Sequence, residues 1–184
     1  MIICGIDPGI TGAISHFIDG RLDEVIDMPV LAGRVDGHQL EEMFGFIKPD
    51  FFYLEDTQPM PKNGSIASFK LGLNTGIVIG VVQAMHLPLI RVRPATWKRK
   101  MGLIGKPKDA VRGVVVELYP DIADGVRRVK DQGRADAIMI GRYGVYDRIH
   151  TEKEEPDEAA EAGQEASVSV LRGDRAPHSS EARS

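Results

Sequence analysis

Short apolar runs and longer segments with helical spacing alternate along the first 150 residues. Apolar runs bounded by turn residues predict strands at 1–7, 51–55 and 89–92. The segments 12–18 and 22–28 flank Asp19 and Gly20, a dipeptide typical of a hairpin turn. Apolar residues at helical spacing predict helices at 39–47, 65–85, 108–118 and 131–149. Hairpin-linked strands followed by alternating helices and strands indicate an α/β protein with a mixed sheet.

The composition changes after residue 150. Residues 151–184 contain nine acidic and four basic residues, a net charge of −5, and no aromatic side chain. Because this segment offers too little apolar surface to offset the entropy of ordering the chain, we predict a disordered acidic tail. Residues 1–150 are long enough for a single domain with its own core.

Composition also argues against several classes of protein. A single cysteine, Cys4, precludes a disulfide framework or a Cys-rich zinc site. The chain has no uninterrupted apolar run of about 18 residues, so we expect no membrane span. The N-terminus enters a strand-like pattern without the features of a signal peptide, which predicts a cytoplasmic protein.

Positive charge is concentrated in residues 91–134, which hold twelve basic and five acidic residues, a net charge of +7. Such a concentration is typical of a phosphate-binding face, and a solvated helix with scattered cations is the alternative. The residues best placed for phosphate contact surround a predicted loop and helix start: Lys98, Arg99, Lys100, Lys106 and Lys108. Trp97 in the same loop either stacks on a base or anchors the loop to the body.

Two acidic residues stand at the ends of apolar strands. Asp7 closes the first predicted strand and Glu55 closes the strand at 51–55. An acid at the end of a buried strand is costly unless it binds a cation or hydrogen-bond donors, and for Asp7 a turn is the alternative. Open α/β sheets bind ligands at the carboxyl ends of their strands, so we expect the two carboxylates to meet there.

Two further acids belong to the last predicted helix. Asp136 lies among apolar residues inside the helix, where aspartate is disfavoured and a buried one requires a partner. Asp131 lies five residues earlier and is suited to cap the helix. Carboxylates without clustered His or Cys suit Mg²⁺, with Mn²⁺ as a substitute. Two such ions about 4 Å apart can activate a water and stabilise the leaving oxygen of a phosphodiester.

Four segments carry a recognisable pattern in this order: GIDPGITGAI, LEDTQPMPKNGSIASFKLGLNTG, RPATWKRKMGL and ADAIMI. Over residues 1–149 the sequence resembles the RuvC-type Holliday junction resolvases of the RNase H-like superfamily. Its short length and GRADAI sequence are similar to the phage and poxvirus branch. The resemblance implies an RNase H-like mixed five-stranded sheet flanked by helices. It also implies a homodimeric, Mg²⁺-dependent endonuclease that cuts four-way DNA junctions in a bacterial or phage-infected bacterial cell.

The resemblance also implies roles for particular residues. Asp7, Glu55 and Asp136 match three catalytic acids that bind the metal ions. The bacterial pattern places a fourth acid three residues before Asp136, where this chain has Gly133. Asp131 is the nearest carboxylate and is predicted to take that place.

Two residues are implied in DNA contact around the start of the helix at 65–85. Lys62 lies next to the proposed site, and Phe69 lies in a region with which the family probes the junction. For Phe69 a place in the core is the alternative.

Three alternative functions stay open at this point. An actin-like or sugar-kinase ATPase also begins with a strand, an aspartate and a Gly-rich hairpin, but it needs two such domains around its nucleotide. A junction-binding protein without catalysis is consistent with the missing fourth acid. An RNase H-like ribonuclease would use the same carboxylates.

Overall fold

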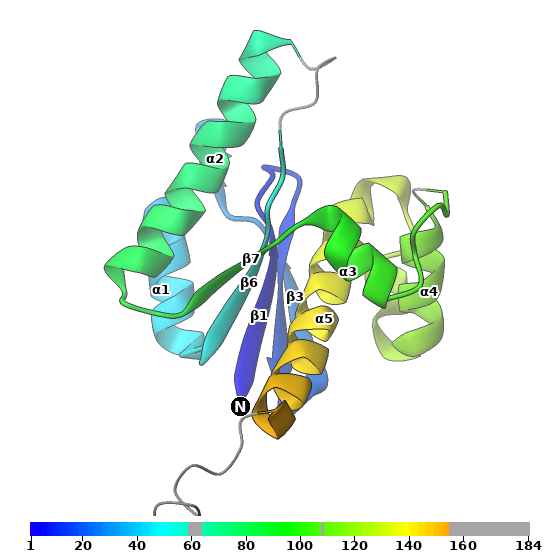
Figure 1. The fold of residues 1–184 in the computed structure, drawn as a ribbon. Coiled ribbons are helices and arrows are strands. Elements are labelled where there is room, and N and C mark those ends of the chain that lie inside the picture. Colours follow the sequence, from blue (N-terminus) through cyan, green and yellow to red (C-terminus); the bar gives the residue numbers. More distant parts are fainter. Residues whose placement is uncertain (59–63, 108, 155–184) are drawn as a thin grey trace, which may run out of the picture. The chain divides into compact units, whose positions relative to one another are not determined.

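A mixed five-stranded sheet in the order β3-β2-β1-β6-β7 carries the fold (Figure 1). The computed structural model describes residues 1–58, 64–107 and 109–154. The strands are β1 (Ile2–Asp7), β2 (Ala13–Ile18), β3 (Arg21–Asp27), β6 (Phe51–Glu55) and β7 (Leu89–Val92). β2 and β3 run antiparallel to their neighbours, whereas β6 and β7 run parallel to β1. The predicted mixed sheet and all five of its strands are confirmed.

The predicted hairpin between β2 and β3 turns at Asp19 and Gly20. Both residues have positive φ angles, 49° and 80°, as a two-residue hairpin turn of the favoured hand requires. A second, very short hairpin was not predicted: β4 (Val30–Leu31) pairs with β5 (Arg34–Val35). Its two-residue strands are too short to produce an alternating hydrophobic pattern.

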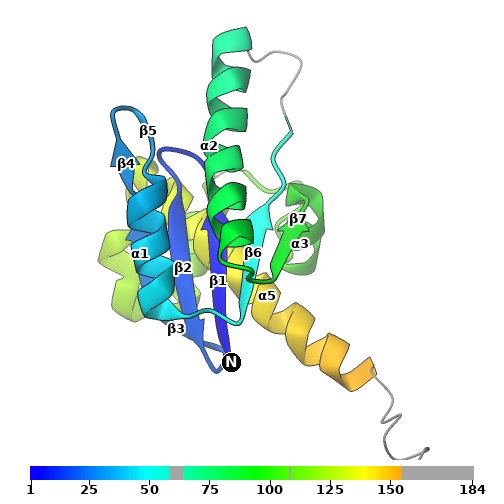
Figure 2. The ribbon, with the colours of Figure 1, turned by 90° about the vertical axis from the view of Figure 1, so that its left-hand side faces the viewer.

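Helices cover both faces of the sheet (Figures 1 and 2). One face carries α1 (Gly37–Ile47) and α2 (Ser65–Ala84). The other face carries α3 (Pro94–Lys100), α4 (Ala110–Leu118) and α5 (Gln132–Glu154). Two short 3₁₀ helices, η1 (Pro120–Gly125) and η2 (Val129–Asp131), connect α4 to α5.

Two hydrophobic clusters fill the space between the sheet and its helices. Alternate residues of β1 point to opposite sides, so that Ile3 packs with Trp97 of α3 while Cys4 packs with Phe44 of α1. Residues Met1–Ile149 form one packed unit. The helix α5 continues to Glu154, past both its predicted end at residue 149 and the predicted start of the tail at 151. The remainder of that predicted tail, residues 155–184, lies outside the described residues.

The helix α2 is apolar over most of its surface. By length and composition alone it could cross a membrane, and the core helices of soluble proteins meet the same criterion. Of its most apolar window, 22% is buried. From the sequence we expected no helix of this kind, because glycines and polar residues interrupt the apolar run. These residues do not make the helix polar as a whole. Val78 and Val82 are buried against the sheet, and Asn74 Oδ1 accepts a hydrogen bond from the Val35 amide at 2.9 Å.

Candidate active site

The carboxyl ends of β1 and β6 bring Asp7 and Glu55 to the same edge of the sheet. The two strands are parallel neighbours in which Ile6 lies opposite Leu54, so the next residue of each strand is an acid. Glu55 is 8% exposed and ends its strand inside the fold rather than on its surface. The two predicted acids therefore end neighbouring strands.

Both acids lie on the face of the sheet that α5 covers. Asp7 shares its face with Gly5, where an added Cβ would lie 2.2 Å from the Gly141 amide nitrogen of α5. Glu55 shares its face with Tyr53, whose hydroxyl donates a hydrogen bond to Asp147 of α5 at 2.6 Å. The alternation of side chains thus directs both carboxylates toward α5.

Asp136 lies on the stripe of α5 that faces β6. Tyr143 and Asp147, seven and eleven residues later, share that stripe. Tyr143 packs edge-to-face on Tyr53 with ring centroids 6.1 Å apart, and Asp147 accepts the hydrogen bond from the same tyrosine. Two turns before Tyr143, Asp136 therefore lies toward the carboxyl end of β6, near Glu55. The structure brings Asp7, Glu55 and Asp136 to one edge and one side of the sheet.

Asp136 is held by a residue that sequence reasoning missed. Gln132 Nε2 donates a hydrogen bond to Asp136 Oδ1 at 3.0 Å, and Arg112 of α4 donates to Gln132 Oε1 at 2.8 Å. The spacing of Gln132 and Asp136, four residues apart on one helix, is a signal that could have predicted the first contact. The contact from Arg112 is long-range and carries no local signal.

Gly133 is the position at which the bacterial pattern has its fourth acid. A Cβ added there would lie 2.2 Å from the Thr11 carbonyl oxygen and 2.8 Å from the Gly12 Cα. Both atoms belong to the backbone of the turn between β1 and β2, so they cannot rotate away. The glycine allows α5 to approach this turn, and the same approach leaves no room for a carboxylate at that position.

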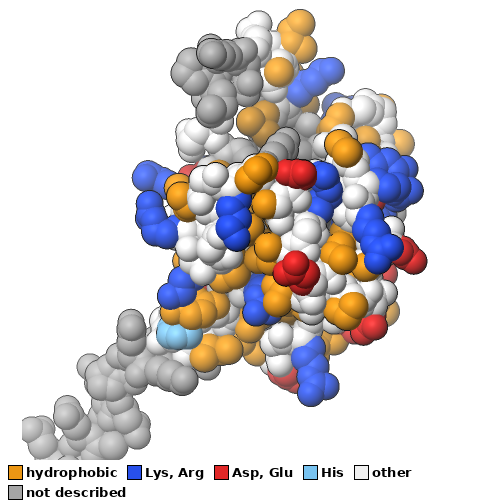
Figure 3. All heavy atoms as spheres, turned by 90° about the vertical axis from the view of Figure 1, so that its right-hand side faces the viewer, with side chains coloured by type: hydrophobic (Ala, Val, Ile, Leu, Met, Phe, Trp, Pro, Cys, Tyr) orange, Lys and Arg blue, Asp and Glu red, His pale blue; other side chains and the backbone are white. Residues whose placement is uncertain are grey.

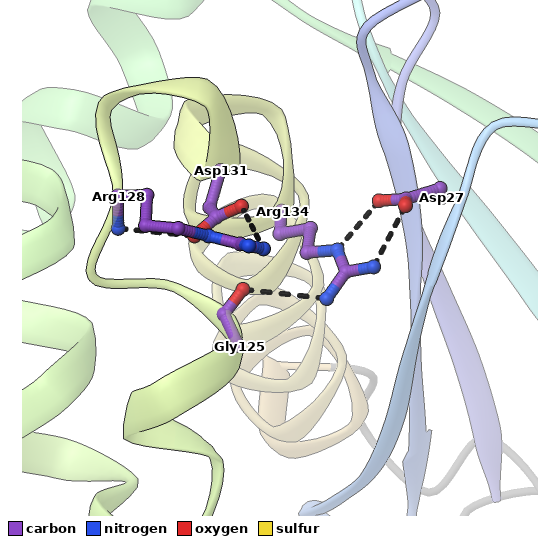
Figure 4. A network of polar contacts seen from close by, with 5 residues as sticks. All are labelled: Asp27, Gly125, Arg128, Asp131 and Arg134. Atoms are coloured by element: carbon purple, nitrogen blue, oxygen red, sulfur yellow. Dashed lines mark hydrogen bonds and ion pairs between the residues drawn. The ribbon is translucent and has the colours of Figure 1, made fainter.

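Asp131 was predicted as the substitute ligand, and the structure gives it a different environment (Figure 4). It is 4% exposed and accepts three hydrogen bonds from Arg128: from Nε and Nη2 at 2.9 Å each and from the backbone amide at 3.0 Å. The Arg128 guanidinium holds the pKa of Asp131 below its usual value. On the same side, Arg134 binds Asp27 of β3 at 2.5 and 2.7 Å and reaches the Gly125 carbonyl at 3.3 Å.

This environment separates Asp131 from the other three acids. It lines a hollow of about 270 Å³ together with residues of the β1–β2 turn and Asp27, toward β3, whereas Asp136 faces β6. Asp131 directly precedes α5, but its carboxylate accepts a hydrogen bond from the Arg128 amide and so caps the short helix η2, not the long helix that the sequence predicted it to cap. Metal binding by Asp131 would require this ion pair to open.

The predicted basic loop begins as a helix. Residues 94–100 form α3, with Pro94 in its first turn, and Trp97 is fully buried and anchors α3 to the core. The ammonium groups of Lys98 and Lys100 lie over the rings of Trp97 at 5.0 Å and Tyr146 at 3.9 Å. Figure 3 shows lysine and arginine side chains in separate groups on the face that carries α4, with acidic side chains among them.

The other predicted DNA contacts have varied surroundings. Arg99 and Lys106 are exposed on the surface. Phe69, on α2, is 71% exposed, which excludes the alternative that it belongs to the core. Lys62 and Lys108 lie outside the described residues.

Three comparisons relate the chain to known proteins. No protein-family model matches it. Over 94 residues, 50% of its length, the chain is 31% identical to the chloroplastic Holliday junction resolvase MOC1 of Chlamydomonas reinhardtii, and it spans only 11% of that protein. Thermus thermophilus RuvC in complex with a Holliday junction substrate superposes with a TM-score of 0.58 and 19% identity, over 82% of this chain and 97% of that one. A second Thermus thermophilus RuvC structure gives 0.58 and 20%, over 82% and 98%.

These likenesses show the fold. The RNase H-like fold implied by the resemblance to RuvC is confirmed, with the five-stranded sheet and flanking helices in one unit. None of the comparisons bears on the phage and poxvirus branch, which stays a prediction.

Proposed function

We propose that this chain is a metal-dependent endonuclease that resolves four-way DNA junctions by phosphodiester hydrolysis. The observation that carries the proposal is the convergence of Asp7, Glu55 and Asp136 on one edge and one side of an RNase H-like sheet. The local identity to a Holliday junction resolvase and the likeness to the RuvC fold support a junction as the substrate.

The three carboxylates fit a hard divalent cation by their donor chemistry. Oxygen ligands from Asp and Glu suit Mg²⁺ and Mn²⁺, and the site that we propose holds two such ions. In the described part of the chain no three His, Cys, Asp or Glu side chains are already grouped closely enough to hold an ion, so binding would draw these oxygens together. When bound, the ions would activate a water and stabilise the leaving oxygen of the phosphodiester.

The residues of this chain would hold and orient the reacting groups. Asp7, at the end of β1, and Glu55, at the end of β6, supply ligands from rigid strands. The burial of Glu55 keeps bulk water from one side of the site. We include Asp131 as a fourth ligand only if its ion pair with Arg128 opens on DNA binding.

The DNA that we propose as substrate would be bound by basic and aromatic side chains around this edge. Helix α3 follows β7, whose last residue pairs with Glu55, so its cations extend from the same end of the sheet. Lys98, Arg99, Lys100 and Lys106 would contact phosphates, together with Lys62 and Lys108. Phe69 would stack on a base near the junction.

A homodimer would supply the two active sites that symmetric cutting of two opposed strands needs. The apolar surface of α2 supports this state, because Ile66 and Leu73 are 72% and 39% exposed. A second copy of the chain would cover these side chains at the two-fold axis.

The test is cleavage of an end-labelled four-way junction with and without Mg²⁺. We expect Asp7→Asn to abolish cutting while junction binding, measured by gel shift, is retained, because the change keeps the shape and removes a ligand charge. Asp124→Asn is the matched control, since the side chain of Asp124 is 98% exposed and forms an ion pair with the exposed Arg127.

Three outcomes would contradict the proposal. Undiminished Mg²⁺-dependent cutting by Asp7→Asn would remove the active-site assignment. Binding without cutting at every Mg²⁺ concentration would identify a junction-binding protein. Preference for an RNA–DNA hybrid over the junction would identify a ribonuclease.

A further inference from the structure

Two hydrogen bonds in series connect α4 to Asp136. Arg112 Nη1 donates to Gln132 Oε1 at 2.8 Å, and Gln132 Nε2 donates to Asp136 Oδ1 at 3.0 Å. A guanidinium can only donate, so the contact with Arg112 fixes the oxygen end of the amide and directs its N–H₂ end to the carboxylate. The amide of Gln132 therefore has one orientation that satisfies both neighbours.

The arrangement restricts Asp136 from two separate elements. Gln132 lies one helical turn before Asp136 on α5, and Arg112 reaches Gln132 from the first turn of α4. All three side chains are partly buried, where a hydrogen bond to an ionised group is stronger than one in water. The bond to Oδ1 restricts rotation of the carboxylate about its last torsion angle.

We propose that Arg112 and Gln132 are positioning residues that orient the Asp136 carboxylate for metal binding. The inference rests on the acid site of the proposed function. Partners that hydrogen-bond a metal ligand fix its orientation, and their loss typically weakens metal affinity by about 10–100-fold. Arg112 acts through Gln132 and does not itself reach the carboxylate.

A different role for Arg112 makes different predictions. It belongs to the basic segment 91–134 and lines, with Asp109, Val129 and Gln132, a surface hollow of about 380 Å³. If Arg112 contacted a DNA phosphate there, its loss would lower junction affinity and the salt dependence of binding. If it positions Asp136, its loss lowers metal affinity in the absence of DNA.

The experiment measures Mn²⁺ affinity of the full chain without DNA, by titration followed with electron paramagnetic resonance. We expect Gln132→Met, which keeps the volume of the side chain but has no amide, to raise the dissociation constant about tenfold or more. Gln132→Ala should do the same. Arg127→Ala is the matched control for loss of one arginine, because Arg127 is 63% exposed and pairs with the exposed Asp124. Thermal unfolding of each variant checks that the fold is kept.

The dependence of Arg112 on Gln132 is tested by the double variant. Arg112→Ala should weaken Mn²⁺ binding on its own and have no further effect in the Gln132→Met background. In junction cleavage, both single variants should raise the half-saturating Mg²⁺ concentration more than they lower the rate at saturating Mg²⁺.

Four results would overturn the inference: no Mn²⁺ binding by the unmodified chain, unchanged or tighter binding by Gln132→Met, no weakening by Arg112→Ala alone, or full additivity in the double variant. A failure of the proposed function has a different signature. In that case the variants weaken Mn²⁺ binding as expected, but the unmodified chain cuts no junction.

Discussion

Gly133 offers a direct test of the packing that shapes the site. In Gly133→Ala the new Cβ would meet the Thr11 carbonyl oxygen at 2.2 Å and the Gly12 Cα at 2.8 Å, distances at which the backbone must move. Overpacking of this kind costs about 1–3 kcal/mol, and an obstacle made of backbone places the cost toward the upper end. Replacing a helical glycine by alanine returns up to about 1 kcal/mol. We expect a net loss of about 2 kcal/mol in the free energy of unfolding.

The assay is thermal unfolding of the full chain by circular dichroism. A loss of about 2 kcal/mol corresponds to a fall in Tm of roughly 4–8 °C for a protein of this size. The matched control is Gly113→Ala on α4, where an added Cβ meets nothing within 4 Å. That variant should gain about 0.5–1 kcal/mol, because alanine loses less conformational freedom on folding than glycine.

Gly133→Asp extends the test to function. The substitution restores the acid of the bacterial pattern, yet the structure predicts that it lowers both stability and cleavage. The reason is that Thr11 and Gly12 follow Asp7 in the same turn, so a displaced turn also displaces that carboxylate. A Gly133→Asp variant as stable as the unmodified chain, with faster cutting, would refute the reasoning.

Three other predictions concern stability, DNA affinity and assembly. Arg128→Ala leaves the buried Asp131 carboxylate without its guanidinium and should lower the free energy of unfolding at pH 7, measured by urea unfolding. Because the pKa of Asp131 is lowered in the folded state, this difference should persist above about pH 4 and vanish as the pH falls through the folded pKa. Replacing the three cations of α3 with alanine should reduce the slope of log affinity against log salt by up to about 0.9 per lost phosphate contact, measured on junction DNA. These are Lys98, Arg99 and Lys100. Leu73→Glu should shift the chain from dimer to monomer in light scattering; an unchanged mass would place the interface elsewhere.

Hydrophobic patterns predicted the sheet and the edge of it at which Asp7 and Glu55 lie. The strands at 51–55 and 89–92 have the predicted bounds. Pro49 lies just before the first of them and Pro94 just after the second, so each apolar run has a clear limit at that end. The turn at Asp19 and Gly20 was predictable from residues that tolerate positive φ. The edge shared by Asp7 and Glu55 follows from parallel strand ends alone.

Side-chain contacts account for what the sequence left open. The helix α3 was expected as a loop, since its seven residues are too few to show a period, and the burial of Trp97 fixes it to the core. Asp131 was predicted as a ligand because a sequence shows acids and not their partners. The guanidinium of Arg128, three residues earlier, donates hydrogen bonds to both carboxylate oxygens of Asp131.

The missing fourth acid and the position of Asp136 have one physical origin. Helix α5 lies close to both β1 and β2: the Ala137 carbonyl accepts a hydrogen bond from Ser15 Oγ of β2 at 2.7 Å, and a Cβ added to Gly5 of β1 would lie 2.5 Å from that carbonyl. The same helix carries Asp136, one residue earlier, on the stripe that faces β6. The same approach closes the space beside Gly133. Close packing of α5 thus favours three carboxylates at this edge, and any further metal ligand would come from outside position 133.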